Sequence, residues 1–228
     1  MAMLTADTDY IEPRNRLTVA FRLILAIPHI IVNYVWTYFV EILAFIQWFI
    51  IVFTGKRNNG IWGLQWAWLR YSSRVLGYEV LLFDGYPRFG PDQDHLPMEV
   101  DLAYEEPASR LTNGLRFLWI IPAALVGLVV GIGAFFVAIV SWFAILITGK
   151  HPRGMFEFLL NVTRYSVQLN AYMMLMTDTY PKWGSGVPGT VPGPAPLAPP
   201  PMSAPTPASA PVSASTSGAS LPPPTATG

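Results

Sequence analysis

An internal repeat constrains this chain more than any other feature of its sequence. When the sequence is shifted by 94 residues, residues 10–90 align with residues 104–184 without a gap, and 28 of the 81 aligned positions are identical. The identical blocks include Arg16-Leu17-Thr18 with Arg110-Leu111-Thr112, Thr54-Gly55-Lys56 with Thr148-Gly149-Lys150, and Arg70-Tyr71-Ser72 with Arg164-Tyr165-Ser166. A unit of about 80 residues has been duplicated in tandem, so the fold of one unit must be present twice.

The composition indicates that both units belong in a membrane. Hydrophobic residues make up 52% of the chain and charged residues only 12%. Soluble domains carry roughly 25% charged residues. The formal net charge is zero, which provides no basic field for nucleic acid, and the lack of cysteine excludes disulfides and thiolate sites. We therefore expect an integral membrane protein without a nucleic-acid partner.

Changes in composition also divide the chain into segments. The end of the chain consists mainly of Pro, Ala, Ser, Thr, Gly and Val, and such a segment cannot bury enough apolar surface to offset its chain entropy. Between the repeats, Met98, Val100 and Leu102 alternate with acidic residues, which predicts a short strand, with the N-terminal segment beside it. The predicted segments are a polar N-terminus (1–9), membrane repeat 1 (10–90), an acidic linker (91–103), membrane repeat 2 (104–184) and a disordered tail (185–228).

Each repeat contains a long stretch without basic residues. No Lys or Arg occurs between Arg22 and Lys56 or between Arg116 and Lys150, so each stretch has 33 residues, and the only charge within either is Glu41. As a helix, such a stretch extends about 50 Å, whereas the hydrocarbon core of a bilayer is about 30 Å thick. The stretch is long for one membrane span and short for two.

Two topologies follow from that length. One is a tight transmembrane hairpin of two short helices, and the other is a short interfacial helix ending near Pro28 or Pro122 followed by one span of about 25 residues. The positive-inside rule favours the hairpin, because the hairpin puts the basic residues at both ends of each stretch on one side of the membrane. Gly127, Gly131 and Gly133 fit a tight turn in the second repeat. The spacing of Gly127 and Gly131 also fits a helix-packing face.

A segment of amphipathic helical character follows each apolar stretch, at residues 61–83 and 155–177. In the second segment, one helical stripe is polar and contains Glu157, Asn161, Arg164 and Gln168. An arginine at the bilayer midplane costs roughly 2.5–3.5 kcal/mol, so we expect these helices to lie in the membrane interface. A buried helix packed with its polar side against the other repeat is the alternative. The predicted fold is thus an all-α integral membrane protein, a tandem duplication of a transmembrane helical hairpin plus an amphipathic interfacial helix.

The sequence contains no constellation that we would assign to catalysis or to a cofactor. Both Thr-Gly-Lys junctions resemble part of a phosphate loop, but Ile50 and Ala144 stand where that loop needs glycine. Arg57 and His151 stand where it needs Ser or Thr. We interpret each junction as a helix stop with a lysine at the lipid headgroups. The three histidines are too scattered to form a metal-ligand set, so we expect no enzyme, no cofactor and no metal.

Duplicated basic residues are the candidate binding residues. We expect them to form a collar that contacts lipid headgroups, anionic ones in particular, and they are Arg16, Arg22, Lys56, Arg70, Arg110, Arg116, Lys150 and Arg164. Glu41 is a candidate functional carboxylate within the membrane, because ionisable residues there are costly.

The repeated motifs resemble a known family. R-L-(x)4-R-(x)5-P, W-F-(x)4-T-G-K, R-Y-S and D-x-Y-P occur in that order in both copies, and together they are similar to the bacterial, chiefly actinobacterial, membrane family called domain of unknown function 4389. The resemblance covers about residues 10–184 and implies an integral membrane protein of the bacterial cell envelope without an established activity. We expect a multi-pass protein of the plasma membrane with cytoplasmic loops and termini. We expect a non-enzymatic scaffold or accessory subunit with a membrane-protein partner. The alternative is a transporter component that handles lipids or small solutes.

Overall fold

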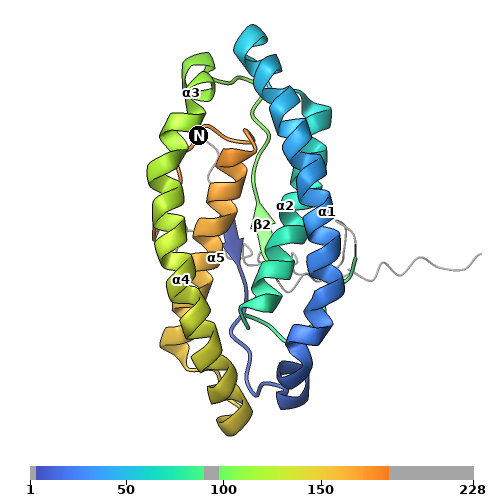
Figure 1. Ribbon diagram of the computed structural model, residues 1–228, viewed down its shortest axis with the longest axis vertical. Coiled ribbons are helices and arrows are strands. Elements are labelled where there is room, and N and C mark those ends of the chain that lie inside the picture. The colour runs from blue at the N-terminus through green and yellow to red at the C-terminus, as the bar shows by residue number, and fades with distance from the viewer. Residues whose placement is uncertain (1–3, 90–97, 185–228) are drawn as a thin grey trace, which may run out of the picture. The chain divides into compact units, whose positions relative to one another are not determined.

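The computed structural model describes residues 4–89 and 98–184, which include both repeats (Figure 1). The predicted disorder of residues 185–228 lies outside the described residues, as does most of the predicted linker. The described part is mostly helical and contains two equivalent helical units. In chain order the elements are β1 (Thr5–Asp7), α1 (Arg16–Thr54), α2 (Asn59–Glu79), β2 (Glu99–Asp101), α3 (Arg110–Gly114), α4 (Arg116–Thr148) and α5 (Arg153–Met173).

The apolar stretch of each repeat forms one continuous helix, so the predicted hairpins are wrong. α1 has 39 residues and α4 has 33, and each runs through its internal proline, Pro28 or Pro122. The glycines of α4 are not a turn. Instead, Gly127 and Gly133 let α5 approach closely: a Cβ on Gly127 would lie 3.0 Å from the side chain of Leu169. Both long helices are apolar and long enough to cross a membrane by length and composition.

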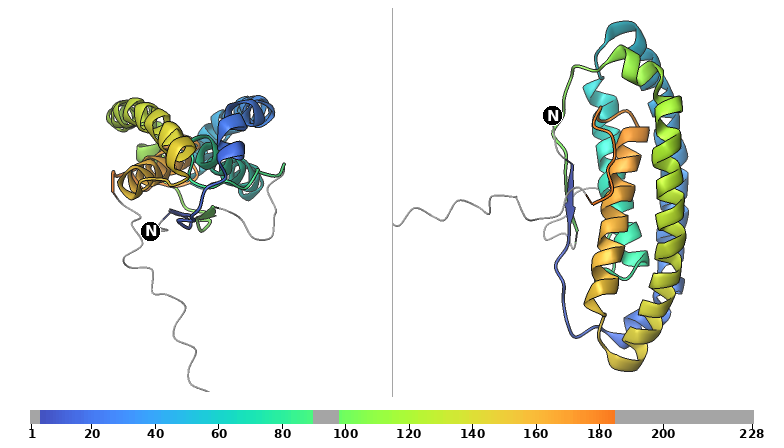
Figure 2. Two further views of the ribbon diagram at one scale, coloured as in Figure 1. Left: turned by 90° about the horizontal axis from the view of Figure 1, so that it is seen from below. Right: turned by 90° about the vertical axis from the view of Figure 1, so that its left-hand side faces the viewer.

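The amphipathic helices form a second layer beneath the long helices (Figure 2). α2 packs on α1, α5 packs on α4, and α2 and α5 also contact each other. Their apolar faces are therefore buried in protein, which corrects the prediction that these faces lie in lipid. Each helix ends in a turn in which a leucine, Leu81 or Leu175, has a positive φ, and this turn reverses the chain.

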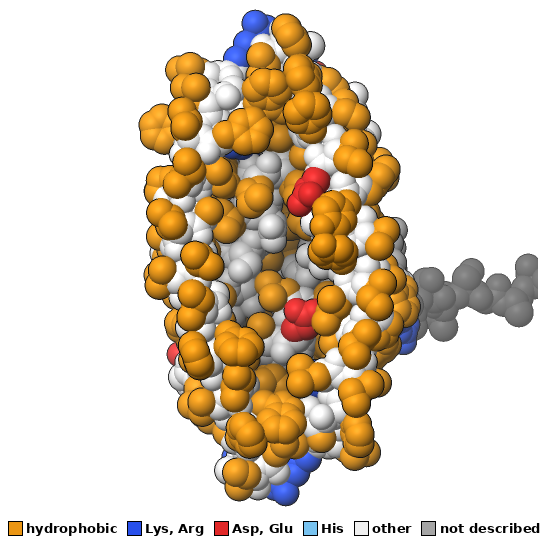
Figure 3. Space-filling view, viewed as in Figure 1, with side chains coloured by type: hydrophobic (Ala, Val, Ile, Leu, Met, Phe, Trp, Pro, Cys, Tyr) orange, Lys and Arg blue, Asp and Glu red, His pale blue; other side chains and the backbone are white. Residues whose placement is uncertain are grey.

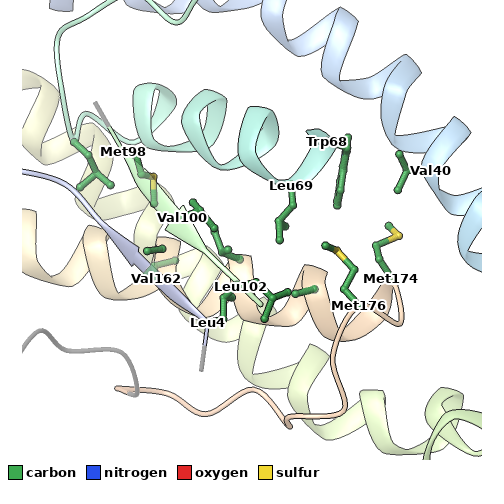
Figure 4. Packing of buried hydrophobic residues seen from close by; sticks show 14 of the residues in the cluster. Leu4, Val40, Trp68, Leu69, Met98, Val100, Leu102, Val162, Met174 and Met176 are labelled. Atoms are coloured by element: carbon green, nitrogen blue, oxygen red, sulfur yellow. The ribbon is translucent and has the colours of Figure 1, made fainter. Parts of the chain in front are cut away.

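A two-stranded antiparallel sheet forms the third layer and confirms the predicted strand pair. β1 pairs with β2, with Ala6 opposite Val100, beside the middle of the helices (Figure 2). Leu4, Met98 and Leu102 are buried against the helices (Figure 4). The sheet thus covers the side of α2 and α5 that faces away from the long helices.

The two repeats exchange equivalent contacts. The backbone N–H of Arg14 donates to the carbonyl of Gly149, and the N–H of Ala108 donates to that of Gly55. The equivalent tyrosine hydroxyls also bond across the repeats, from Tyr10 to the carbonyl of His151 and from Tyr104 to that of Arg57. Each contact from the first repeat to the second has an equivalent contact from the second to the first. The repeats are therefore related by an approximate twofold axis. α1 and α4 share one layer and run in opposite directions, so this axis passes through the layers (Figures 1 and 2).

Candidate functional site: an apolar face and a groove between the repeats

The Thr-Gly-Lys junctions end the long helices, as predicted. Gly55 and Gly149 have φ values of 74° and 73° and donate to the carbonyls of Ile51 and Ile145. Lys56 and Lys150 follow them and are exposed. Each junction glycine also lies beside an arginine of the other repeat, since a Cβ on Gly149 would be 3.2 Å from Nε of Arg16.

Arg16 and Arg110 are exposed at opposite ends of the unit. Arg110 Nη2 donates to the carbonyl of Thr54 at 3.1 Å, so it also caps the C-terminus of α1. Their exposure, like that of Lys56 and Lys150, is compatible with the predicted headgroup collar.

Arg22 and Arg116 are buried in internal ion pairs, which corrects their predicted place in the headgroup collar. Arg22 Nη2 lies 2.8 Å from Oδ1 of Asp84, and Nη1 donates to the carbonyl of Tyr78. Arg116 makes the equivalent ion pair with Asp178 at 2.9 Å. Because both guanidinium groups are buried and bind partners inside the protein, they do not contact lipid headgroups.

A second arginine approaches each aspartate, and sequence reasoning missed both. Arg14 lies 3.5 Å from Asp84, whereas Arg57 reaches Asp178 across the repeat boundary. Burial lowers the pKa of both arginines, and the neighbouring aspartate opposes that effect. His151 occupies the place equivalent to Arg57 and is buried.

His151 therefore stands in a cationic surrounding. Burial, followed by the positive charges of Arg14 and Arg22, lowers its pKa to about 4, although Asp84 acts in the opposite direction. The imidazole is thus neutral at physiological pH. The first repeat has a cation at the equivalent position, so the two copies have diverged here.

Arg164 of α5 faces the strand layer. Arg164 is buried, its Nε donates to the carbonyl of Ala6, and its Nη2 lies 2.9 Å from Asp7. Burial in this ion pair removes Arg164 from the predicted collar. Its equivalent, Arg70, is partly buried on α2.

The long helices expose one large apolar face. Of the large hydrophobic side chains that are exposed in the described residues, 18 lie on α1 and 15 on α4, but only one each on α2 and α5. Figure 3 shows these side chains along the whole face, with basic side chains at its two ends. Only 22% of the most apolar stretch of α1 and 11% of that of α4 are buried, so neither helix is enclosed in the core of the unit.

The opposite side of the unit carries exposed carboxylates. Glu99 and Asp101 of β2 are exposed, and the Asp7 side chain is 48% exposed even though it pairs with Arg164. Because β1 and β2 lie beside the middle of the helices, these charges are at mid-length (Figure 2). The unit thus has an apolar side and a charged side.

A groove opens on the apolar face between α1 and α4, and it was not predicted. Its volume is about 520 Å³, and its lining is mostly apolar. Gly131, Ala134 and Ala138 form one wall, and Glu79 at the end of α2 also lines it. The rim includes Phe135, whose side chain is 63% exposed, so the groove is open to whatever covers the apolar face. Figure 3 shows this face hollowed between the two long helices.

Comparison of the two repeats could have located this groove. At the positions of Gly131 and Ala134, the first repeat has Thr37 and Val40, which are larger, and at the position of Glu79 the second repeat has Met173. The positions that are identical in the two repeats reveal the duplication, whereas the positions that differ locate the groove.

Glu41, the predicted functional carboxylate, is exposed on α1. Its equivalent in the second repeat is Phe135, on the rim of the groove. Within residues 4–89 and 98–184, no group of three or more His, Cys, Asp or Glu side chains could hold a metal ion.

The comparisons with known proteins identify the repeated unit. No curated protein and no solved structure matches the chain significantly. The family model described as "Domain of unknown function (DUF4389)" matches twice, at residues 16–90 and 110–184. These matches cover more than half of the chain, and they coincide with the two equivalent helical units. The protein therefore belongs to this family and carries its domain in tandem.

Proposed function

We propose that the protein is a non-enzymatic membrane scaffold whose α1–α4 face is embedded in one leaflet of a bacterial plasma membrane. The observation that carries this proposal is the concentration of exposed apolar side chains on α1 and α4. An apolar face of this length cannot be left in water without association. Lipid covers it without requiring a second protein.

The length of the helices favours an orientation parallel to the membrane. At about 1.5 Å per residue, the 39 residues of α1 extend about 58 Å, nearly twice the hydrocarbon core of about 30 Å. A helix that crossed the bilayer would carry exposed apolar residues far outside it. A helix that lies in the interface keeps its whole apolar face in contact with lipid.

The exposed carboxylates favour the same orientation. If α1 and α4 crossed the membrane, Asp7, Glu99 and Asp101 would lie near the bilayer midplane, because the strands are beside the middle of the helices. A charged side chain there costs roughly 2.5–3.5 kcal/mol even on the lowest scales. In the parallel orientation, α2, α5 and the strands lie on the water side.

The basic residues at the helix ends agree with this placement. Arg16 and Lys150 lie at one end of the unit, and Arg110 and Lys56 at the other. Because the repeats are related by a twofold, a crossing orientation would put equal positive charge on both sides of the membrane, against the positive-inside rule. The parallel orientation puts all four residues at the headgroups of one leaflet, which we place on the cytoplasmic side. It replaces the multi-pass topology expected from the sequence.

Two features support the scaffold role: the two repeats form one block, and a Pro-rich segment follows them in the chain. Reciprocal hydrogen bonds at the Thr-Gly-Lys junctions join the two repeats into one block. The Pro-rich segment 185–228 follows the block and is the part of the chain that we assign to a membrane-protein partner.

Co-purification from native membranes tests the scaffold role. We expect the full chain to resist extraction by alkaline carbonate and to retain a partner protein at constant stoichiometry in mild detergent. A variant that ends at residue 184 should stay in the membrane and lose the partner. A full chain that purifies alone, at every detergent concentration that preserves the complexes of other membrane proteins, would contradict the scaffold role.

A second candidate function, the handling of a lipid or another amphiphile, is favoured by the groove of about 520 Å³ on the apolar face. Its size is within the range of small-molecule sites, about 300–1,000 Å³. A defined lipid that co-purifies with the chain, in the absence of a protein partner, would favour this function over the scaffold role.

A further inference from the structure

The groove exists on only one side of the approximate twofold. The equivalent position is lined by Trp48, Arg116, Phe117, Ile120, Met173 and Leu175, and its volume is only about 90 Å³. Five of these residues have their repeat equivalents in the lining of the large groove. The two cavities are formed by equivalent backbone segments, yet they differ several-fold in volume.

Side chains of the first repeat fill the smaller place. Val40 and Trp68 are buried there, where the second repeat has Ala134 and Val162. Trp68 Nε1 donates to the hydroxyl of Thr37 at 3.0 Å, and Thr37 is the equivalent of Gly131. A Cβ built on Gly131 would meet no atom within 4 Å. The large groove is therefore a product of small side chains, since the backbone of each repeat provides the same frame.

The large groove also contains a carboxyl group without a partner. Two charged residues line it, Arg22 and Glu79. Arg22 is already paired with Asp84, whereas Glu79 has neither a hydrogen bond nor an ion pair among the described residues. Burial raises the pKa of Glu79 to about 7. Met173 stands at the equivalent position, so the carboxylate and the open volume occur together in one copy.

The mouth of the groove faces the lipid-covered side of the unit. Leu23, Phe135 and Phe143 line the groove and are 73%, 63% and 53% exposed on the apolar face. An acyl chain can therefore pass from the bilayer into the groove without crossing water. At the same time Glu79, at the end of α2, belongs to the layer that lies nearer to the headgroups in the parallel orientation.

We propose that the groove binds a membrane lipid with a primary ammonium headgroup, which donates hydrogen bonds to Glu79 while an acyl chain lies between α1 and α4. Charge complementarity supports this ligand. A nearby ammonium stabilises the ionised form of Glu79, which only accepts hydrogen bonds, and a primary ammonium offers three donors together with the opposite charge. A choline headgroup carries the same charge but has no N–H to donate. The groove should therefore distinguish ethanolamine from choline lipids.

Photocrosslinking of lipid to the reconstituted full chain tests this inference, which rests on the proposed membrane embedding. The probe is a trace of phosphatidylethanolamine with a photoreactive acyl chain, in phosphatidylglycerol vesicles, so that added ethanolamine and choline lipids can be compared as competitors. We expect saturable crosslinks to peptides from residues 131–143, with competition by unlabelled phosphatidylethanolamine. Competition by the same amount of phosphatidylcholine should be weaker by about tenfold or more, because a hydrogen bond to a charged group is lost.

The first repeat supplies the matched variants. Gly131→Thr with Ala134→Val copies the residues of the filled place and should abolish saturable crosslinking. Glu79→Gln keeps the shape of the groove and should weaken the competition by phosphatidylethanolamine about tenfold. Glu41→Gln removes a carboxylate of the same face outside the large groove and should change nothing. Equal unfolding midpoints in detergent identify variants that fold as the wild type does.

The outcomes separate this inference from the proposed membrane embedding. Vesicle flotation reports embedding and does not depend on the groove. Crosslinking that survives the double substitution would overturn the groove as the binding site. Competition by ethanolamine and choline lipids that is equal, or that Glu79→Gln leaves unchanged, would overturn the ammonium headgroup as the ligand. A wild-type full chain that does not float with the vesicles would overturn both proposals.

Discussion

Arg57 of the first repeat and Asp178 of the second form an ion pair that joins the two copies of the domain. On the other side of the twofold, Asp84 is paired with Arg14, which precedes α1 of the same repeat. In the alignment, Ala108 is the equivalent of Arg14, and His151 is the equivalent of Arg57. Each aspartate therefore has one additional arginine, which comes from a different position in each case. The two repeats thus meet the same electrostatic need with a cation from different positions.

This exchange predicts a compensated double substitution. Arg57→His should lower the free energy of unfolding by about 2 kcal/mol, less than the 3–5 kcal/mol of a fully buried pair, because Asp178 is partly exposed and keeps Arg116. Ala108→Arg, added to Arg57→His, copies the arrangement around Asp84 and should recover at least half of that loss. Denaturant unfolding in detergent micelles measures both effects. A double variant that is no more stable than Arg57→His alone would contradict the equivalence of the two arrangements.

The junction glycines should resist substitution. Gly149 has a φ of 73°, and a Cβ on it would lie 3.2 Å from Arg16 Nε and Nη2. Gly149→Ala should therefore lower the unfolding free energy by about 1–2 kcal/mol. Gly154 is the control, since a Cβ there would meet no atom within 4 Å and alanine suits the helix. Equal stability of the two alanine variants would show that the left-handed turn does not constrain the junction.

Stability should fall as the pH decreases from 6.5 toward 4 because of His151. Its pKa is about 4 in the folded chain and 6.5 when unperturbed, so in this window the unfolded chain binds a proton that the folded chain does not. Between pH 7 and pH 5 we expect a loss of roughly 2 kcal/mol from this group. His151→Asn should flatten the pH dependence of the thermal midpoint in this range. An unchanged slope in that variant would assign the pH dependence to other groups.

The sequence predicted the parts of the fold that depend on local pattern. The duplication, the helix stops at Gly55 and Gly149, the amphipathic helices and the strand pair all follow from identity, periodicity or glycine. These features are determined within one repeat or by the alternation of apolar and polar residues. They can therefore be predicted without knowing how the two repeats pack together.

Features that depend on the membrane, or on contacts between residues that are distant in sequence, were not predicted. The hairpin hypothesis assumed that the basic residues at both ends of an apolar stretch share one side of the membrane only if the chain turns back. A continuous helix that lies in the interface meets the same condition without a turn. Similarly, Arg22, Arg116 and Arg164 were assigned to headgroups because their partners Asp84, Asp178 and Asp7 are distant in sequence.

The orientation of the long helices in the membrane is the central claim, and cysteine labelling tests it most directly. The chain has no cysteine, so Lys56→Cys and Lys150→Cys each introduce a single reactive thiol, at the ends of α1 and α4. These ends are opposite ends of the unit, because the two helices run antiparallel (Figure 1). With sealed vesicles of known sidedness and a thiol reagent that does not cross the bilayer, the parallel orientation predicts labelling of both cysteines from the same side. Labelling of the two cysteines from opposite sides would show that α1 and α4 cross the membrane and would contradict the account.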